Sequence, residues 1–212
     1  MTAIKNIIFD FGGVILNINY YLAVAAFKEL GLEDFDQWYS QKNQSNLFDE
    51  FEIGQISPQA FREEIKKHFT KPITDEQINK AWNALLLDLP AERIQLIQAI
   101  GKKYRCFLLS NTNEIHIESF SAEIERVYGM NTFNNLFEKI YYSSRINMRK
   151  PDKEIFEYVL KENGLAPEET IFIDDSIQHI DGAIKTGIRT LFLSTDKTIL
   201  DLFDKELNLI IP

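Results

Sequence analysis

The chain has 212 residues, of which 45% are hydrophobic and 26% charged, a balance typical of a globular protein with one large domain or a core with a small insert. Its net charge of −9 would repel a phosphate backbone, so we expect no nucleic-acid partner. Cys106 is the single cysteine, which excludes an internal disulfide bond. The sequence has neither a signal-like start nor an apolar run long enough for a membrane span, so we expect a cytoplasmic protein.

Short apolar runs without polar alternation predict parallel strands that are buried on both faces of a sheet. These runs are residues 4–10, 104–110, 140–142, 170–174 and 190–193. Between the later runs, residues 91–100, 152–163 and 176–186 have the apolar spacing and the end residues of helices. The alternation of strand and helix predicts an α/β fold, with a Rossmann-like parallel sheet and helices on both faces.

Residues 18–90 form a contrasting segment, which contains amphipathic helical patterns and no convincing strand. The predicted helices cover 21–30, 35–51, 57–69 and 74–85. Thr74, followed by Gln77 three residues later, fits a capping box at the start of the last one. We therefore predict a helical cap of residues 18–90, inserted after the first strand into a core of residues 1–17 and 91–212. Such a cap would lie above Asp10.

Polar residues follow the apolar runs or precede the helices at four places. These are Asp10, Ser110 with Asn111, Lys150, and Asp174 with Asp175. Each alone has a simple structural explanation as a turn former, a helix cap or a solvated charge. Parallel strands, however, bring their carboxyl ends to one edge of the sheet, where α/β proteins bind ligands. The joint pattern therefore predicts one site.

The residue types suit phosphoryl transfer through an aspartyl phosphate on Asp10. Mg²⁺ would ease the repulsion between this carboxylate and a phosphate, and it needs only one or two carboxylate ligands. Asp175 would supply the second carboxylate, and Asp174 would bind the ion directly or support its ligands. Lys150 would offset negative charge, and the Ser110 hydroxyl would hold phosphate oxygens.

The sequence resembles the haloacid dehalogenase superfamily of phosphohydrolases in four motifs that are spread over most of the chain. The motifs are FDFGGVI at 9–15, LSNTN at 109–113, RKP at 149–151 and FIDD at 172–175. It is most similar to a subgroup of bacterial sugar-phosphate phosphatases that act on glucose 1-phosphate. The helical insert also occupies the position of that superfamily's common cap.

The resemblance implies a role for each motif residue. Asp10 would be the nucleophile, and Lys150 would orient the reacting groups. Contacts to phosphate or substrate are implied for Phe11, Gly12, Ser110, Asn111 and Lys150. The implied Mg²⁺ ligands are Asp10, Gly12 through its carbonyl oxygen, Asp174 and Asp175. We expect a small phosphorylated metabolite as the binding partner, and a monomer or weak homodimer.

One position departs from the superfamily pattern, because Gly12 stands where most of its phosphatases carry a second aspartate. That aspartate protonates the leaving oxygen and then activates water, and such proton transfers contribute about 100- to 10,000-fold. Three explanations are open. Another group such as His116, Glu50 or Glu52 takes over, or the substrate has a good leaving group, or the protein has lost turnover.

Other functions of similar chemistry fit the sequence less well. A metal-independent 2-haloacid dehalogenase also forms an aspartyl ester, but Asp174 and Asp175 would repel the carboxylate of its substrate. A signalling receiver domain has its acid pair early and its lysine last, the reverse of the order here. A phosphomutase would need an acid–base group to make the attack of a sugar hydroxyl efficient, and Gly12 does not provide one. A non-catalytic phosphate-binding protein stays open because of Gly12, but we favour a Mg²⁺-dependent phosphatase of small metabolites.

The leaving-group explanation for Gly12 makes a direct prediction. An anomeric phosphate is a good leaving group, so glucose 1-phosphate should be hydrolysed much faster than glucose 6-phosphate. Phosphate release from the two isomers, at equal concentrations and with Mg²⁺ present, measures the difference. Equal rates would contradict this explanation.

Overall fold

The computed structural model describes residues 2–39 and 46–210 and contains one sheet of five parallel strands. Their order across the sheet is β3-β2-β1-β4-β5. The strands are β1 (Asn6–Phe9), β2 (Arg105–Ser110), β3 (Lys139–Tyr142), β4 (Thr170–Asp174) and β5 (Arg189–Phe192). The predicted α/β fold with a parallel sheet is confirmed. The central strand β1 pairs with both β2 and β4, so the ends of these three strands are neighbours.

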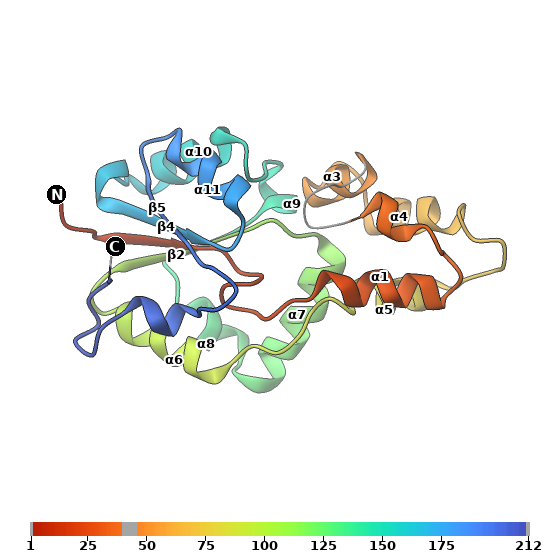
Figure 1. Ribbon diagram of the computed structural model, residues 1–212, viewed down its shortest axis with the longest axis horizontal. Coiled ribbons are helices and arrows are strands. Elements are labelled where there is room, and N and C mark those ends of the chain that lie inside the picture. Colours follow the sequence, from red (N-terminus) through yellow and green to blue (C-terminus); the bar gives the residue numbers. More distant parts are fainter. Residues whose placement is uncertain (1, 40–45, 211–212) are drawn as a thin grey trace.

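Helices cover both faces of the sheet (Figure 1). One face packs against α6 (Ala91–Ile100), α7 (Glu114–Val127), α8 (Met130–Asn134) and the 3₁₀ helix η2 (Ile199–Leu202). The other face packs against α10 (Lys153–Asn163) and α11 (Ile177–Ile184). Successive strand residues point to opposite faces, so Ile7 and Phe9 enter the first layer and Ile8 the second. Burial on both faces explains why the strand lacks polar alternation.

Two helices follow strands so closely that the sequence pattern did not reveal them. Three residues separate the end of β2 from the start of helix α7, and the Asn113 side chain caps this helix by accepting from the His116 N–H at 3.1 Å. The short helix α9 (Ser143–Ile146) follows β3 without a gap, and a 3₁₀ turn, η1 (Pro167–Glu169), precedes β4. Ser110 and Asn111 therefore lie in a strand-to-helix junction.

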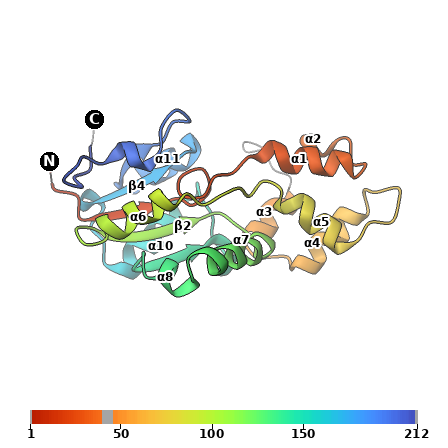
Figure 2. The same ribbon diagram turned by 90° about the horizontal axis from the view of Figure 1, so that it is seen from below.

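Within the described residues, the segment between β1 and α6 contains five helices, which pack around a separate hydrophobic cluster that Ile115 of α7 joins. They are α1 (Tyr20–Glu29), α2 (Phe35–Trp38), α3 (Asn46–Glu52), α4 (Pro58–Lys66) and α5 (Asp75–Asn83). Thr74 and Gln77 form the expected capping box at the start of α5. Figures 1 and 2 show these helices beyond one end of the sheet, on the opposite side of the molecule from both termini. We call this group, α1–α5, the helical insert.

One sequence-based assignment is wrong. A single helix over 35–51 is interrupted, because α2 ends at Trp38 and Tyr39 has an extended backbone; residues 40–45 lie outside the described residues. The Tyr39 ring packs against Phe48 and Trp82 at centroid distances of 4.9 and 4.7 Å, so tertiary packing overrides the helical spacing. For residues 207–211 the sequence allows either a last edge strand or a docking segment. Position 211 lies outside the described residues; up to residue 210, Leu209 forms a single bridge to Phe203, and Leu207 and Leu209 pack against the core, as a docking segment would.

Two chain segments connect the helical insert to the core, and they are paired with each other. The Asn17 N–H donates to the Asp88 carbonyl, and the Leu87 N–H donates back to the Asn17 carbonyl, both at 2.9 Å. The Asn19 N–H donates to the Leu85 carbonyl, also at 2.9 Å. The insert thus leaves and rejoins the core at one place, next to the carboxyl end of β1.

Further polar contacts fix the insert to the core on two sides. On the first side, the Ser143 hydroxyl donates to the Glu52 carbonyl at 2.6 Å, and the Asn147 amide donates to the Ile53 carbonyl at 2.8 Å. On the second side, Trp82 Nε1 donates to Asn113 Oδ1 at 3.3 Å. Within the described residues, no helix is both long and apolar enough to cross a membrane.

Gly182 in α11 offers a test of how tightly the layer beside Lys150 is packed. A Cβ atom at this position would overlap the Pro151 carbonyl oxygen, a backbone atom that cannot rotate away. We expect Gly182→Ala to lower the free energy of unfolding by about 1–3 kcal/mol, measured by urea denaturation.

Gly101→Ala is the matched control for this measurement. Gly101 has an ordinary helical φ of −60°, and its added Cβ would meet the Ile97 carbonyl oxygen at 3.2 Å. Its effect should stay within about 1 kcal/mol. Equal losses in the two variants would contradict the packing argument.

Candidate active site

Three neighbouring strands deliver the polar residues of the site to one edge of the sheet. Asp10 follows β1 directly, Ser110 is the last residue of β2, and Asp174 is the last residue of β4. The Asp10 N–H donates to the Ile173 carbonyl at 2.9 Å, which continues the pairing between β1 and β4. The convergence that the sequence predicted is therefore present.

Lys150 is the charged centre of this edge, and its side chain is fully buried. Its Nζ lies 2.5 Å from Asp10 Oδ1 and 2.7 Å from Asp174 Oδ2. Burial by itself would lower the pKa of Lys150, but the two carboxylates outweigh burial and raise the pKa above its usual value. Lys150 is therefore an ammonium ion that bridges two strand ends.

Asn111 holds the backbone of Lys150 in place through a pair of hydrogen bonds. Its side-chain amide donates to the Lys150 carbonyl at 2.8 Å, and its Oδ1 accepts from the Lys150 N–H at 2.9 Å. The peptide bond between Lys150 and Pro151 is cis. Both ends of the Asn111 side-chain amide are therefore engaged by the backbone of Lys150.

Asp174 is enclosed by donors and has no exposed surface. Besides Lys150, its carboxylate accepts from the Ser176 N–H at 2.7 Å and contacts His179 Nδ1 at 2.9 Å. Burial raises the pKa of Asp174, but Lys150 and His179 more than compensate and lower it below its usual value. Asp174 therefore stays ionised.

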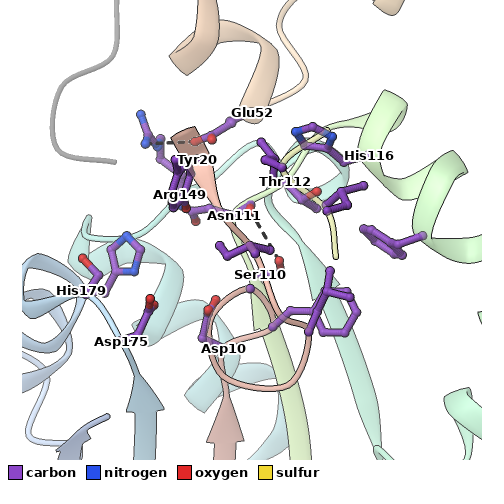
Figure 3. Close-up of a pocket in the computed structure, with 18 of the residues that line it drawn as sticks. Asp10, Tyr20, Glu52, Ser110, Asn111, Thr112, His116, Arg149, Asp175 and His179 are labelled. Atoms are coloured by element: carbon purple, nitrogen blue, oxygen red, sulfur yellow. Dashed lines mark hydrogen bonds and ion pairs between the residues drawn. The ribbon is translucent and has the colours of Figure 1, made fainter. Parts of the chain in front are cut away.

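His179 was not expected at the site, since an isolated histidine is more often a surface or packing residue. It lies on α11, five residues after Asp174, and the turn at Ser176 folds it back over this carboxylate. The residue also lines the pocket beside Asp175 (Figure 3). A helix start directly after the acid pair is the sequence signal that points to it.

The three aspartates form a cluster that can hold a cation. Oxygen atoms from Asp10, Asp174 and Asp175 all lie within 4.8 Å of one another. Burial raises the pKa of Asp10 to about 7; the other two aspartates add to the rise, and Lys150 opposes it. Burial and then the charge of Asp174 raise the pKa of Asp175 to about 6. The cluster is thus short of positive charge, and its hard oxygen donors suit a divalent ion such as Mg²⁺.

The segment after Asp10 contributes backbone to the pocket. The Phe11 ring packs edge-on against Phe120, at a centroid distance of 5.0 Å, so its side chain belongs to the core. Gly13 has a φ of +81°, and a Cβ there would overlap the Asp175 carboxylate. Gly12 offers no side-chain acid, and a Cβ there would meet Ile18 Cδ1 at 3.0 Å.

A pocket lies above Asp10 and is lined in part by the helical insert. The insert contributes Tyr20, Tyr39 and Glu52, and the core contributes residues that include Ser110, Thr112, His116, Arg149, Asp175 and His179. Figure 3 shows Asp10 and Asp175 on one side of this space and Glu52 with Arg149 on the opposite side. We call Asp10, Asp174, Asp175 and Lys150 the floor, and Glu52 with Arg149 the roof.

The structure separates the three residues that the sequence offered as replacement acids. Glu50 is exposed and does not line the pocket, whereas Glu52 and His116 do. His116 is buried, its ring stacks on Trp82, and its Nδ1 lies 2.8 Å from Asn83 Oδ1. Burial lowers the pKa of His116 to about 3, so the imidazole is neutral near pH 7.

Comparison with known proteins gives the family. Residues 7–193 match the family model of haloacid dehalogenase-like hydrolases. The chain belongs to this family. The resemblance inferred from the four sequence motifs is confirmed.

The names of two curated relatives point to very different substrates. A D-ribitol-5-phosphate phosphatase from Bacteroides thetaiotaomicron is 34% identical over 187 residues, which cover 88% of this chain and 90% of that protein. A sesquiterpene phosphatase from Aspergillus oryzae is 25% identical over 194 residues, covering 91% of each chain.

A solved structure of a haloacid dehalogenase-family enzyme from Bacteroides thetaiotaomicron is also closely similar. An aspartate-to-alanine variant of that enzyme, in complex with magnesium and inorganic phosphate, has a TM-score of 0.89 and 33% sequence identity. The similarity covers 96% of this chain and all of that one.

The raised pKa values on the floor predict a pH-dependent response to metal. A carboxyl group whose pKa rises on folding from 3.8 to about 6–7 stabilises the fold most below about pH 4 and loses this contribution as the pH rises through 6–7. As the pH rises from about 5 to 8, the ionisation of Asp10 and Asp175 should therefore lower the stability of the metal-free protein. Mg²⁺ should raise the Tm more at about pH 8 than at about pH 5, because protons compete with the ion at the lower pH.

Thermal unfolding with and without Mg²⁺ at the two pH values measures this response, and Asp10→Asn is the control. The variant lacks the charge that binds the ion, so its stabilisation by Mg²⁺ should be smaller. A Tm increase that is the same at both pH values would count against a metal site on the floor.

Proposed function

We propose that this protein is a Mg²⁺-dependent phosphatase of small phosphorylated metabolites that works through an aspartyl phosphate on Asp10. The observation that carries the proposal is the buried ammonium of Lys150, which joins Asp10 to Asp174 beside the pocket-lining Asp175. Similarity to phosphatases, and to an enzyme solved with magnesium and phosphate, supports it.

The proposed architecture has two parts. Residues 1–17 and 91–212 would form the catalytic core, and residues 18–90 would form a cap that encloses the substrate. The separate hydrophobic cluster of the helical insert and its position over Asp10 support this division.

Asp10 and Asp175 are the proposed carboxylate ligands of Mg²⁺, together with the backbone carbonyl of Gly12. Asp174 makes its closest contacts to Lys150, Ser176 and His179, so we propose that it mainly positions the lysine and supports the metal site. Bound Mg²⁺ would neutralise negative charge on the floor and on the phosphate oxygens.

The proposed reaction has two steps, and Asp10 acts in both. Its carboxylate oxygen attacks phosphorus, and the bond from phosphorus to the substrate oxygen breaks, so the enzyme carries an acyl phosphate and the leaving oxygen takes a proton from solvent to give the alcohol. Water then attacks this phosphorus and gives up a proton to solvent, which releases inorganic phosphate and restores the carboxylate. Lys150 holds the nucleophile in line, while the Ser110 hydroxyl and main-chain N–H groups near Phe11, Gly12 and Asn111 bind phosphate oxygens.

Sugar and polyol phosphates are the proposed substrates, and glucose 1-phosphate remains our specific prediction. Its leaving oxygen needs little help from an acid, which suits the glycine at position 12. The relative that acts on D-ribitol 5-phosphate supports the broader class of small polyhydroxylated phosphates. We therefore place both compounds in the first substrate panel.

The decisive experiment measures phosphate release from a panel of sugar phosphates, polyol phosphates and nucleotides, with and without Mg²⁺. The wild-type protein should release phosphate only with the ion, and Asp10→Asn should lose at least about 1,000-fold in kcat, because the nucleophile is gone.

Two results would contradict the proposal. Full activity in Asp10→Asn would exclude the aspartyl phosphate. Binding of Mg²⁺ without phosphate release from any substrate of the panel would favour a non-catalytic phosphate-binding protein. The missing acid–base group at Gly12 would then explain the lack of turnover.

A further inference from the structure

A chain of polar contacts crosses the floor of the pocket and ends at a histidine that the proposed reaction does not use. His179 Nδ1 lies 2.9 Å from Asp174 Oδ2, and the same oxygen lies 2.7 Å from Lys150 Nζ. This Nζ in turn lies 2.5 Å from Oδ1 of Asp10, the proposed nucleophile. Three consecutive contacts thus connect His179 to the carboxylate that would attack phosphorus.

The direction of the hydrogen bond from His179 follows from its partner. Asp174 accepts from the Lys150 ammonium through Oδ2 and from the Ser176 N–H through Oδ1. Its pKa is held below the usual value, so the carboxylate has no proton to give. His179 therefore donates from Nδ1, and this bond assigns a proton to that ring nitrogen.

His179 restrains the Asp174 carboxylate in a way that its other two donors do not. Ser176 contacts one carboxylate oxygen and Lys150 the other, whereas His179 Nδ1 lies near both, at 3.1 Å from Oδ1 and 2.9 Å from Oδ2. A donor shared by the two oxygens opposes rotation of the carboxylate group. Because Asp174 is completely buried, an apolar replacement for His179 would leave this carboxylate short of one hydrogen bond.

The surroundings of His179 do not indicate a packing role. Its side chain is 19% exposed and lines the pocket beside Asp175 (Figure 3). It is the third residue of α11, and the N-cap of that helix, Ser176, makes no side-chain capping bond. The buried residues of α11 are Ile180, Gly182 and Ala183. The helix is thus held to the sheet by side chains other than His179.

We infer that His179 is a positioning residue of the proposed phosphatase, which holds the Asp174 carboxylate so that Lys150 stays aligned on Asp10. The inference rests on the proposed function and adds a residue to it. Without the Nδ1–H donor, Asp174 would draw the ammonium of Lys150 closer and weaken its contact with the nucleophile. Misplacement of a reacting group by about 1 Å can cost about 100-fold in rate. His179 transfers no proton in this scheme.

Two variants separate the Nδ1–H donor from the ring that carries it. His179→Asn loses the ring but keeps a donor, because its amide nitrogen stands at the same place along the side chain as Nδ1. His179→Phe keeps an aromatic ring and loses the donor. We expect kcat to fall about 10- to 100-fold in His179→Phe and to stay within about threefold of wild type in His179→Asn. KM should change by less than about threefold in both.

The assay uses p-nitrophenyl phosphate and D-ribitol 5-phosphate with saturating Mg²⁺. Gln178→Ala is the matched control, since Gln178 is the exposed neighbour of His179 on the same helix and is not among the residues that line the described pocket. Its kcat should equal that of the wild type. A packing role for His179 predicts the reverse order, with His179→Phe more active than His179→Asn.

A second measurement needs neither turnover nor metal. Long-range ¹H–¹⁵N NMR of the imidazole nitrogens shows which of them carries a proton, and the chain has 3 histidines to assign. The signals that disappear in His179→Asn belong to His179. They should show a proton on Nδ1 in the metal-free wild-type protein.

The outcomes distinguish this inference from the proposed function. An unprotonated Nδ1, or a kcat in His179→Phe that equals or exceeds that in His179→Asn, would overturn the inference and leave the phosphatase intact. Failure of the wild-type protein to hydrolyse either substrate, or any other of the panel, with Mg²⁺ would overturn both.

Discussion

The buried ammonium of Lys150 is the interaction on which the arrangement of the site depends. It lies between Asp10 and Asp174, which terminate neighbouring parallel strands, and no part of its side chain reaches solvent. Removing one partner of such a group would leave an uncompensated buried charge, which is strongly unfavourable. The fold therefore has to deliver Lys150 to this point, and the two hydrogen bonds between Asn111 and the Lys150 backbone show how the neighbouring strand end does so.

The negative charge of the floor and the position of the roof over it both follow from the placement of Lys150. Burial, together with the negative charge of three aspartates around one lysine, raises the pKa values of Asp10 and Asp175. The floor therefore favours an added cation. On the other side of the pocket, Arg149 continues the same backbone and pairs with acids from α3. Adjacent residues of one short loop thus carry positive charge to both sides of the pocket, which couples the placement of the insert to the placement of the catalytic groups.

The sequence was informative wherever a residue's role depends on its neighbours along the chain. Asp10 and Asp174 could be placed at strand ends because short apolar runs precede them, and the Thr74 capping box could be recognised from Gln77 alone. The position of His179 over Asp174 depends on the turn at Ser176, and the pairing of Glu52 with Arg149 joins residues almost a hundred positions apart. The break after Trp38 likewise follows from the packing of Tyr39 against distant aromatic rings, which local periodicity does not encode.

The paired segments at Asn17 and Asp88 also bear on how such a protein can change over evolution. Because the chain leaves and rejoins the core at hydrogen-bonded residues, the length and sequence between them can vary without displacing the strand ends. In the proposed phosphatase, substrate range and catalytic chemistry would thereby be encoded in different stretches of the gene. The exceptions are core residues such as Ser143 and Asn147, which bind the backbone of the insert and would have to change along with it.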